Sequence, residues 1–289
     1  MNICLFDKTE IECSSPFLSY DDKRGEHILN ILHKVQGDSF TAGIIDGASG
    51  LARITRLDEK ERRIYFEFTA TGDGKPLNPL NMIVGFVRPI QLRRLLRDVA
   101  ALGVNELHLT GTELGEKSYM QSDLAQPEKV RELLLEGTVQ AGSTHVPKVF
   151  IHKNLQECLE DVSKKMALRE PQGPQLNPQG PLSQAGSLRL SKGPHKEQLI
   201  CLDNINPECS LGAALAQDAA VPEALEGPQI TVAIGSERGW TDRERDLMQK
   251  AGFIRCGMGE RIMRTETAVT VAGAIILNSM GRLSGQARQ

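Results

Sequence analysis

Two glycine-bounded loops near the carboxyl end carry the residues best suited to chemistry. The first, residues 235–239, reads Gly-Ser-Glu-Arg-Gly and follows an apolar run at 230–234. The second, residues 257–264, reads Gly-Met-Gly-Glu-Arg-Ile-Met-Arg and precedes a helix-like stretch beginning at Thr265. Glycine lets bare backbone approach a flat ligand, because no Cβ intervenes. One such loop alone would be read as plain turn geometry, but the pair predicts a shared cofactor pocket.

The charged side chains of these loops are the candidates for catalysis. Arg264, beside a helix start, is suited to stabilise negative charge that develops on a substrate. Glu237 or Glu266 would accept a proton or orient the substrate. Simpler roles stay open: Arg264 as a structural ion-pair partner, and Glu266 as a stabiliser of the first helical turn, worth ~0.3–1 kcal/mol.

The segments that must position these loops alternate between strand-like and helix-like patterns. From residue 82 onward, apolar runs of strand length are followed by amphipathic stretches of helix length, which is the spacing of β-α-β units. The sequence therefore predicts an α/β domain with a largely parallel sheet. The expected strands are 82–87, 104–109, 146–151, 199–202 and 230–234, and the expected helices are 90–102, 127–141, 155–166, 242–251 and 265–280.

The amino-terminal part has short strand-like runs separated by turn residues, and this pattern predicts a small β-rich domain. Strand-like runs occupy 40–45, 51–54 and 64–68, with one helix expected at 26–35. We place the two domains at 1–74 and 75–289. The proline- and glycine-rich segment 169–196 predicts a flexible surface insertion without chemistry.

Composition narrows the class of protein. A chain of 289 residues suggests two domains, and its net charge of −3 shows no global basic excess, so any nucleic-acid contact must be local. The six cysteines contain no C-x-x-C pair, which favours reduced thiols in a cytoplasmic protein. No signal peptide is evident, and the longest apolar run, 268–277, is half the ~20 residues of a membrane span.

Several familiar sites are absent from the sequence. It contains no phosphate-binding P-loop, no G-x-G-x-x-G after the first strand of the α/β domain, no H-E-x-x-H and no G-x-S-x-G. The six histidines are too scattered for a metal site to be read from their spacing, so no metal is predicted.

The carboxyl-terminal segments carry a resemblance to a known family. The run 234–244, the Ala-Gly-Phe at 251–253 and the run 259–268 resemble the signature of the RsmE-type ribosomal RNA uridine-N3 methyltransferases of the SPOUT superfamily. Weaker resemblance to the same family lies at 27–32, 37–38, 102–104, 140–142 and 146–147.

This resemblance implies a fold and an activity. The fold would be a trefoil-knotted, parallel-sheet methyltransferase domain preceded by a PUA-like RNA-binding domain, and such enzymes are homodimers. The implied reaction is methylation of uridine N3 in 16S ribosomal RNA, free or in the small ribosomal subunit, with S-adenosylmethionine as methyl donor. Ribose 2′-O-methylation and a catalytically silent RNA-binding protein remain the alternatives.

The resemblance also assigns residues. The cofactor cleft would be lined by Leu202, Ile234, Gly235, Ser236, Glu237, Arg238, Gly239, Met258, Gly259, Ile262 and Met263. Candidate RNA-phosphate contacts are Lys23, Arg24, Arg53, Arg56, Arg88, Arg93, Arg94 and Arg97, for each of which a solvated surface charge is the simpler role. The chain departs from the family pattern at Ser236, Arg238, Ser143 and His33, where proline, glycine, arginine and arginine are usual.

Overall fold

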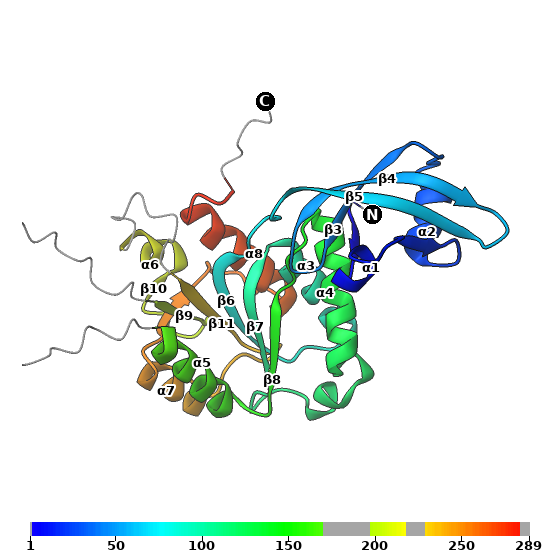
Figure 1. Cartoon of the computed structure of the whole chain (residues 1–289). Helices are drawn as coiled ribbons and strands as arrows, with labels where there is room; N and C mark the ends of the chain where they lie inside the picture. Colours follow the sequence, from blue (N-terminus) through cyan, green and yellow to red (C-terminus); the bar gives the residue numbers. More distant parts are fainter. Residues whose placement is uncertain (1, 170–196, 218–228, 284–289) are drawn as a thin grey trace, which may run out of the picture.

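The computed structural model of the chain describes residues 2–169, 197–217 and 229–283 (Figure 1). These residues form two sheets, each with its own hydrophobic core. The predicted insertion at 169–196 lies, apart from Arg169, outside the described residues. The predicted boundary at 74 falls in the connection between the last strand of the first sheet and the first strand of the second.

The small amino-terminal sheet has five strands in a mixed arrangement. Its first pair is parallel and the other pairs are antiparallel, and its longest pair forms a hairpin that extends away from the larger sheet (Figure 1). The predicted strands 40–45, 51–54 and 64–68 are confirmed with shifted ends. In spatial order the strands are β1 (Cys4–Phe6), β3 (Ser39–Ile44), β4 (Ser49–Asp58), β5 (Arg63–Gly72) and β2 (Phe17–Ser19).

The helix predicted at 26–35 is wrong in its bounds and in its buried face. The structure has α1 (Lys8–Ile11), then α2 (Lys23–Glu26) running into a π-helix (His27–Ile31). The helical segment ends at Ile31, and His33 shortly after it has a left-handed φ of 51°. The apolar pattern of the sequence predicts Ile28, Leu29, Ile31 and Leu32 on the buried side, but Ile28 is fully buried whereas Ile31 is 64% exposed.

The larger sheet has seven strands, all of whose neighbouring pairs are parallel. The prediction of a parallel sheet is confirmed, although two short strands, β10 at one edge and β12 beside it, were not predicted. Parallel pairing brings the carboxyl ends of all these strands to one edge of the sheet. In spatial order the strands are β10 (Cys209–Ser210), β12 (Ile254–Gly257), β9 (Gln198–Leu202), β11 (Ile230–Ile234), β6 (Asn78–Gly85), β7 (Val104–Thr110) and β8 (Lys148–His152).

Helices cover both faces of the larger sheet (Figure 1). Alternate residues of each central strand serve opposite faces: in β6, Met82 and Val84 join one core and Ile83 joins the other. The first face packs against α3 (Pro89–Ala101), α4 (Pro127–Ala141), α6 (Leu211–Gln217) and α8 (Thr265–Ser279), and the second against α5 (Leu155–Arg169) and α7 (Asp242–Lys250). Two 3-10 helices, Lys117–Gln121 and Asp123–Ala125, lie between β7 and α4.

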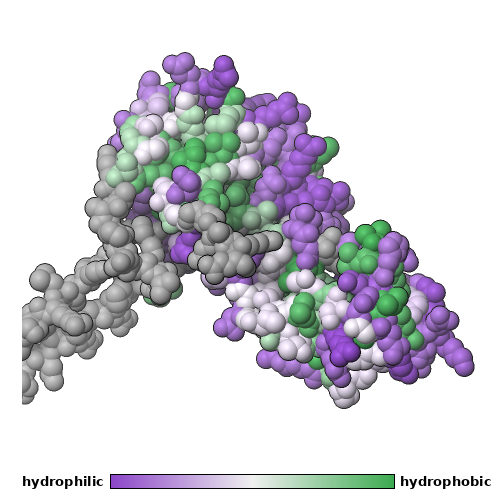
Figure 2. Space-filling model, turned by 90° about the horizontal axis from the view of Figure 1, so that it is seen from above, coloured by the Kyte–Doolittle hydropathy of each residue, from purple (hydrophilic) through white to green (hydrophobic). Residues whose placement is uncertain are grey.

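The last helix, α8, buries one side in this core. Ala268, Val269, Ala272 and Ile276 are buried, while Ile275 is 37% exposed. Figure 2 looks down on the end where α8 lies in Figure 1 and shows apolar surface gathered on the larger domain. The expected dimer contact and the knot stay predictions. No helix among the described residues is long and apolar enough to cross a bilayer.

The two sheets are joined by polar contacts at a single corner. The carboxylate of Asp46 accepts a hydrogen bond from the backbone N–H of Val146 at 2.9 Å, and the hydroxyl of Thr144 donates to the carbonyl of Gly47 at 2.7 Å. These contacts fix the small domain beside the loop that leads into β8.

Candidate functional site

The first predicted loop is a tight turn directly after β11. The backbone N–H of Gly239 donates to the carbonyl of Ser236 at 2.9 Å, and Gly239 has a left-handed φ of 74°. Ser236 is buried, and its hydroxyl accepts a hydrogen bond from Thr112 at 2.9 Å. The serine that replaces the usual proline therefore gains a polar partner.

Bare backbone is required where this turn meets the neighbouring strand. A Cβ added to Gly85, at the end of β6, would lie 2.5 Å from the backbone nitrogen of Ser236. A Cβ on Gly235 would lie 3.0 Å from the Cα of Gly239 and 3.3 Å from the Trp240 ring. Gly85 needs to be glycine because a side chain there would push the turn away from the sheet, and a side chain at Gly235 would crowd the turn itself.

The two charged residues of the turn face solvent. Arg238 is exposed and is not among the residues with positive φ, so the turn accepts arginine in place of the usual glycine without backbone strain. Glu237 is exposed, with its Oε2 atom 3.4 Å from Nε of Arg88. Arg88 also donates a hydrogen bond to the Tyr119 hydroxyl at 3.2 Å. This pair links a candidate catalytic residue to a candidate RNA contact.

The second predicted loop runs from the end of β12 to α8. Gly259 has a φ of 97°, and nothing lies within 4 Å of the place where its Cβ would stand. Met258 and Met263 are half-buried against the core, whereas Ile262 is 83% exposed. The loop thus presents backbone and apolar side chains to open space.

A hydrogen bond joins the end of the second loop to the beginning of the first. The hydroxyl of Thr265, the first residue of α8, donates to the carbonyl of Gly235 at 3.1 Å. Thr265 is only 4% exposed, so this bond is shielded from water. Two loops separated by some twenty residues in sequence therefore meet at the same edge of the sheet.

A third loop, after β9, was missed as part of the site by sequence reasoning apart from Leu202. The indole N–H of Trp240 donates to the carbonyl of Leu202 at 3.2 Å. Nε of Arg245 lies 2.6 Å from the buried carboxylate of Asp203, and this hydrogen bond raises the pKa of Arg245. The signals were the single tryptophan beside the first loop and an aspartate directly after a strand.

The candidate catalytic residues differ in how free their side chains are. Arg264 is the N-cap of α8 and is exposed, and its guanidinium makes no hydrogen bond or ion pair with any residue that the structure describes. Glu266 is half-buried in the first turn of α8, where its charge favours the helix N-terminus. Arg264 is therefore available to a ligand.

The predicted RNA contacts fall into two groups. Arg24 is half-buried and bonded to carboxylates of its own domain, Arg97 pairs with Glu136, and Arg56 lies 3.4 Å from Asp58 with its guanidinium 4.1 Å from the Tyr65 ring centre. Within the described ranges, no ion pair involves the exposed residues Lys23, Arg53, Arg93 and Arg94.

A cavity of about 540 Å³ lies at the carboxyl ends of β7 and β8. None of its lining residues belongs to the predicted cofactor loops, but it adjoins them through the bond between Thr112 and Ser236. The backbone N–H of Glu113 also donates to the buried carboxylate of Glu244 at 2.9 Å. The lining includes Thr112, Glu113, Lys117, Lys153 and Glu244.

The parallel sheet and the two hydrogen-bonded loops at its carboxyl edge define an α/β protein, and residues 74–277 match the RNA methyltransferase domain family. Ribosomal RNA small subunit methyltransferase E of Treponema pallidum (strain Nichols) is 38% identical over 277 residues, covering 96% of this chain and 91% of that protein. Ribosomal RNA small subunit methyltransferase E 1 of Borreliella burgdorferi is 26% identical, with 96% and 98% covered. The chain belongs to the RsmE-type RNA methyltransferase family.

Solved structures share this fold. The ribosomal RNA small subunit methyltransferase E of Neisseria gonorrhoeae, bound to S-adenosyl methionine, aligns with a TM-score of 0.64 at 22% identity, covering 96% of this chain and 97% of that one. The methyltransferase Lpg2936 of Legionella pneumophila, also bound to this cofactor, aligns with a TM-score of 0.65 at 16% identity, covering 96% and 98%. The expected SPOUT-type architecture, with a separate β-rich amino-terminal sheet, is confirmed.

Proposed function

We propose that the protein transfers a methyl group from S-adenosylmethionine to N3 of a uridine in 16S ribosomal RNA, free or within the small ribosomal subunit. It acts as a homodimer in the cytoplasm. The observation that carries this proposal is the buried bond from Thr265 to Gly235, which joins the two glycine loops into one site. The relatives' names support the substrate class, and the cofactor-bound neighbours support the methyl donor.

The loops fit S-adenosylmethionine in their chemistry. An added Cβ would meet nothing within 4 Å at Gly239 or at Gly259, and the second loop also carries the apolar side chains of Met258, half-buried, and Ile262, exposed. Backbone amides and carbonyls of such loops recognise the edge of a purine, and apolar side chains cover its faces. The cofactor supplies a methyl group already activated by a sulfonium. The cradle is formed by Leu202, Ile234, Gly235, Ser236, Glu237, Arg238, Gly239, Met258, Gly259, Ile262 and Met263.

The protein's own contribution to the reaction is orientation and charge. The N3–H group of uracil is a weak acid, so methylation at N3 requires that its proton leave and that the negative charge spread onto O2 and O4. The exposed guanidinium of Arg264 stabilises that charge. Glu237 or Glu266 accepts the proton or orients the base, and Arg88 holds Glu237 in place in the absence of RNA.

RNA is held by exposed basic side chains outside the cleft. On α3, Arg93 and Arg94 are exposed on the side opposite to the buried leucines. On the small domain, Lys23 and Arg53 are similarly exposed. Phosphate contacts of this kind position the RNA without reading its sequence.

A methyl-transfer assay tests the proposal. The purified protein is incubated with methyl-labelled S-adenosylmethionine and small ribosomal subunits or 16S RNA that lack the modification. We expect label on the base, at N3 of uridine, after nuclease digestion and mass analysis. Label on ribose would replace the proposal by 2′-O-methylation. No transfer by a folded protein that binds the cofactor in calorimetry would refute the proposed substrate. A silent RNA-binding protein with a blocked pocket would instead give no heat with S-adenosylmethionine.

A further inference from the structure

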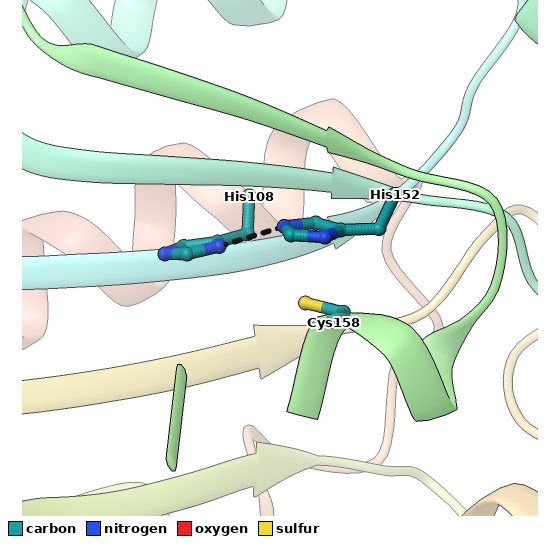
Figure 3. Close-up of side chains that lie close together, drawn as sticks. All are labelled: His108, His152 and Cys158. Carbon is teal, nitrogen blue, oxygen red and sulfur yellow. Dashed lines mark hydrogen bonds between the residues drawn. The ribbon is translucent and has the colours of Figure 1, made fainter. Parts of the chain in front are cut away.

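Two buried histidines and a buried cysteine come together on the α5 face of the larger sheet, away from the glycine loops. His108 lies on β7, His152 ends the neighbouring strand β8, and Cys158 lies on α5 (Figure 3). Their exposed fractions are 1%, 5% and 0%. One ligand atom from each residue lies within 4.8 Å of the others.

The spacing of these atoms approaches that of a tetrahedral metal centre. Nδ1 of His108 lies 3.0 Å from Nε2 of His152. In a tetrahedral zinc site, bond lengths of 2.0–2.1 Å to nitrogen and 2.3 Å to sulfur place ligand nitrogens about 3.3 Å apart and nitrogen and sulfur about 3.6 Å apart. The histidines are therefore already at ligand spacing, and the thiol of Cys158 needs to move by only about 1 Å.

A carboxylate from the same helix offers a fourth ligand. Asp161 follows Cys158 by three residues and so lies on the same side of α5. Its Oδ2 atom lies 3.9 Å from Nδ1 of His108 and is ion-paired with Nζ of Lys165 at 2.9 Å, so a metal would take the place of Lys165 as its partner. A side-chain set of two imidazoles, one thiolate and one carboxylate is typical of zinc sites.

The charges around the cluster favour a divalent cation. Glu106, Asp161 and Lys165 contact one another or the histidines and sum to one negative charge. With the two histidines neutral, Zn²⁺ and the thiolate of Cys158 add +2 and −1, which brings the buried group to neutrality. Buried charge is costly unless it is compensated, so a bound divalent cation would offset the net negative charge of these side chains.

We infer that His108, His152 and Cys158 form a closed structural zinc site, with Asp161 or a water molecule as fourth ligand. Binding releases the Cys158 thiol proton to solvent, and the two imidazoles bind as neutral groups. The metal ties β7, β8 and the start of α5 together. These elements border residues 153–156, which line the 540 Å³ cavity, so the site stiffens the wall of that cavity.

Metal binding by the full-length protein tests this inference. Protein stripped with a chelator is titrated with Co²⁺ and then with Zn²⁺. We expect one equivalent of Co²⁺ to give a thiolate-to-cobalt charge-transfer band and the intense visible bands of a tetrahedral ion, and one equivalent of Zn²⁺ to abolish both. Zn²⁺ also raises the unfolding temperature, because it binds only the native state.

Variants identify the ligands. Cys158→Ser loses the charge-transfer band and weakens zinc binding at least about 100-fold, consistent with the loss of a ligand. Cys209→Ser is the matched control, because Cys209 lies outside the proposed site, with its Sγ atom 3.6 Å from that of Cys256. If Cys158→Ser fails to fold, His152→Asn is used instead, and we expect it to weaken zinc binding and to reduce the visible bands of the tetrahedral ion, because it removes one imidazole ligand. Absence of the band in the wild type, or its loss in Cys209→Ser instead, overturns the inference. None of these readouts depends on methyl transfer.

Discussion

Arg24 in the small domain and Arg264 at the glycine loops were both predicted to act on ligands, yet the structure places them in opposite surroundings. The guanidinium of Arg24 donates to Glu10 at 2.8 Å, to Asp22 at 2.7 Å and to the carbonyl of Leu5 at 2.9 Å, and it lies over the ring of Phe6. The guanidinium of Arg264 is exposed and makes no such bond within the described ranges.

The difference teaches how to separate a structural charge from a functional one. An arginine whose donors are all satisfied by its own domain stabilises the fold, and removing it leaves buried carboxylates without a partner. An arginine kept free at the mouth of a cleft contributes little to the fold, and its charge is available to a reacting group. Residue type cannot distinguish these roles, but local partners can.

The largest effect is expected from Arg264→Ala. Loss of one charge-stabilising donor costs about 2.7–4 kcal/mol of transition-state stabilisation, or 10²–10³-fold in kcat. The affinity for S-adenosylmethionine and the unfolding temperature stay nearly unchanged. Steady-state methyl transfer and calorimetry measure the two quantities, with Arg261→Ala as an exposed control in the same loop. A large loss of cofactor binding in Arg264→Ala would show that its role is misassigned.

Gly85→Ala should displace the backbone of the first glycine loop, residues 235–239. The added Cβ would lie 2.5 Å from the nitrogen of Ser236, so the first loop must shift away from β6. We expect about a 100-fold loss of cofactor affinity, equivalent to about 2.7 kcal/mol. Gly212→Ala is the control, because nothing lies within 4 Å of the Cβ it would gain. If both variants bound S-adenosylmethionine equally well, the first loop would have no role in cofactor binding.

Arg24→Met should act on stability. It removes hydrogen bonds to two partly buried carboxylates, and we expect a loss of about 2 kcal/mol in the free energy of unfolding, measured by denaturant titration. Lys23→Met, at an exposed neighbour, is the control. An unchanged free energy of unfolding would show that the Arg24 cluster contributes nothing to the fold.

The same variant has a pH signature. The hydrogen bond from Arg24 lowers the pKa of Asp22. Burial raises the pKa of Glu10, but the hydrogen bonds from Arg24 and from the backbone N–H of Asp7, together with the charge of Arg24, lower it overall. Carboxylates with depressed folded-state pKa values stabilise the protein above their unfolded pKa, at about 4, and lose that effect as pH falls through the lower folded value. The stability difference between wild type and Arg24→Met should therefore shrink below about pH 4. A difference that stays constant would contradict this linkage.

Thr265→Val is expected to give the smallest change. It leaves the carbonyl of Gly235 without its donor, which costs about 1 kcal/mol and roughly a fivefold loss in cofactor affinity. Thr267→Val is a matched control in the same helical turn, because Thr267 is exposed. If the two variants bind the cofactor equally well, the bond between the loops does not shape the cleft.

Elements with strong periodicity were predictable from the sequence. The strand 230–234 and the helix 127–141 agree with the structure residue for residue. In the helix, Pro127 fixes the start and Gly142 ends it with a left-handed φ of 64°. Local chemistry is enough to define such segments.

Two short strands were not predictable, because they depend on partners distant in sequence. The strands β10 and β12 are two and four residues long; they pair with each other, and β12 also pairs with β9. For the same reason the roles of Asp203 and Trp240 in the site were not predicted: their partners, Arg245 and Leu202, are 42 and 38 residues away. His108 and His152, on adjacent strands, were likewise invisible as a cluster.

The most direct test of the central claim is a crystal structure with S-adenosylhomocysteine bound. The account predicts this molecule between residues 235–239 and 258–263, contacted by backbone atoms of both loops. Its sulfur should point toward the guanidinium of Arg264. Density for the molecule in the 540 Å³ cavity beside β7 and β8, with the two glycine loops empty, would contradict the account.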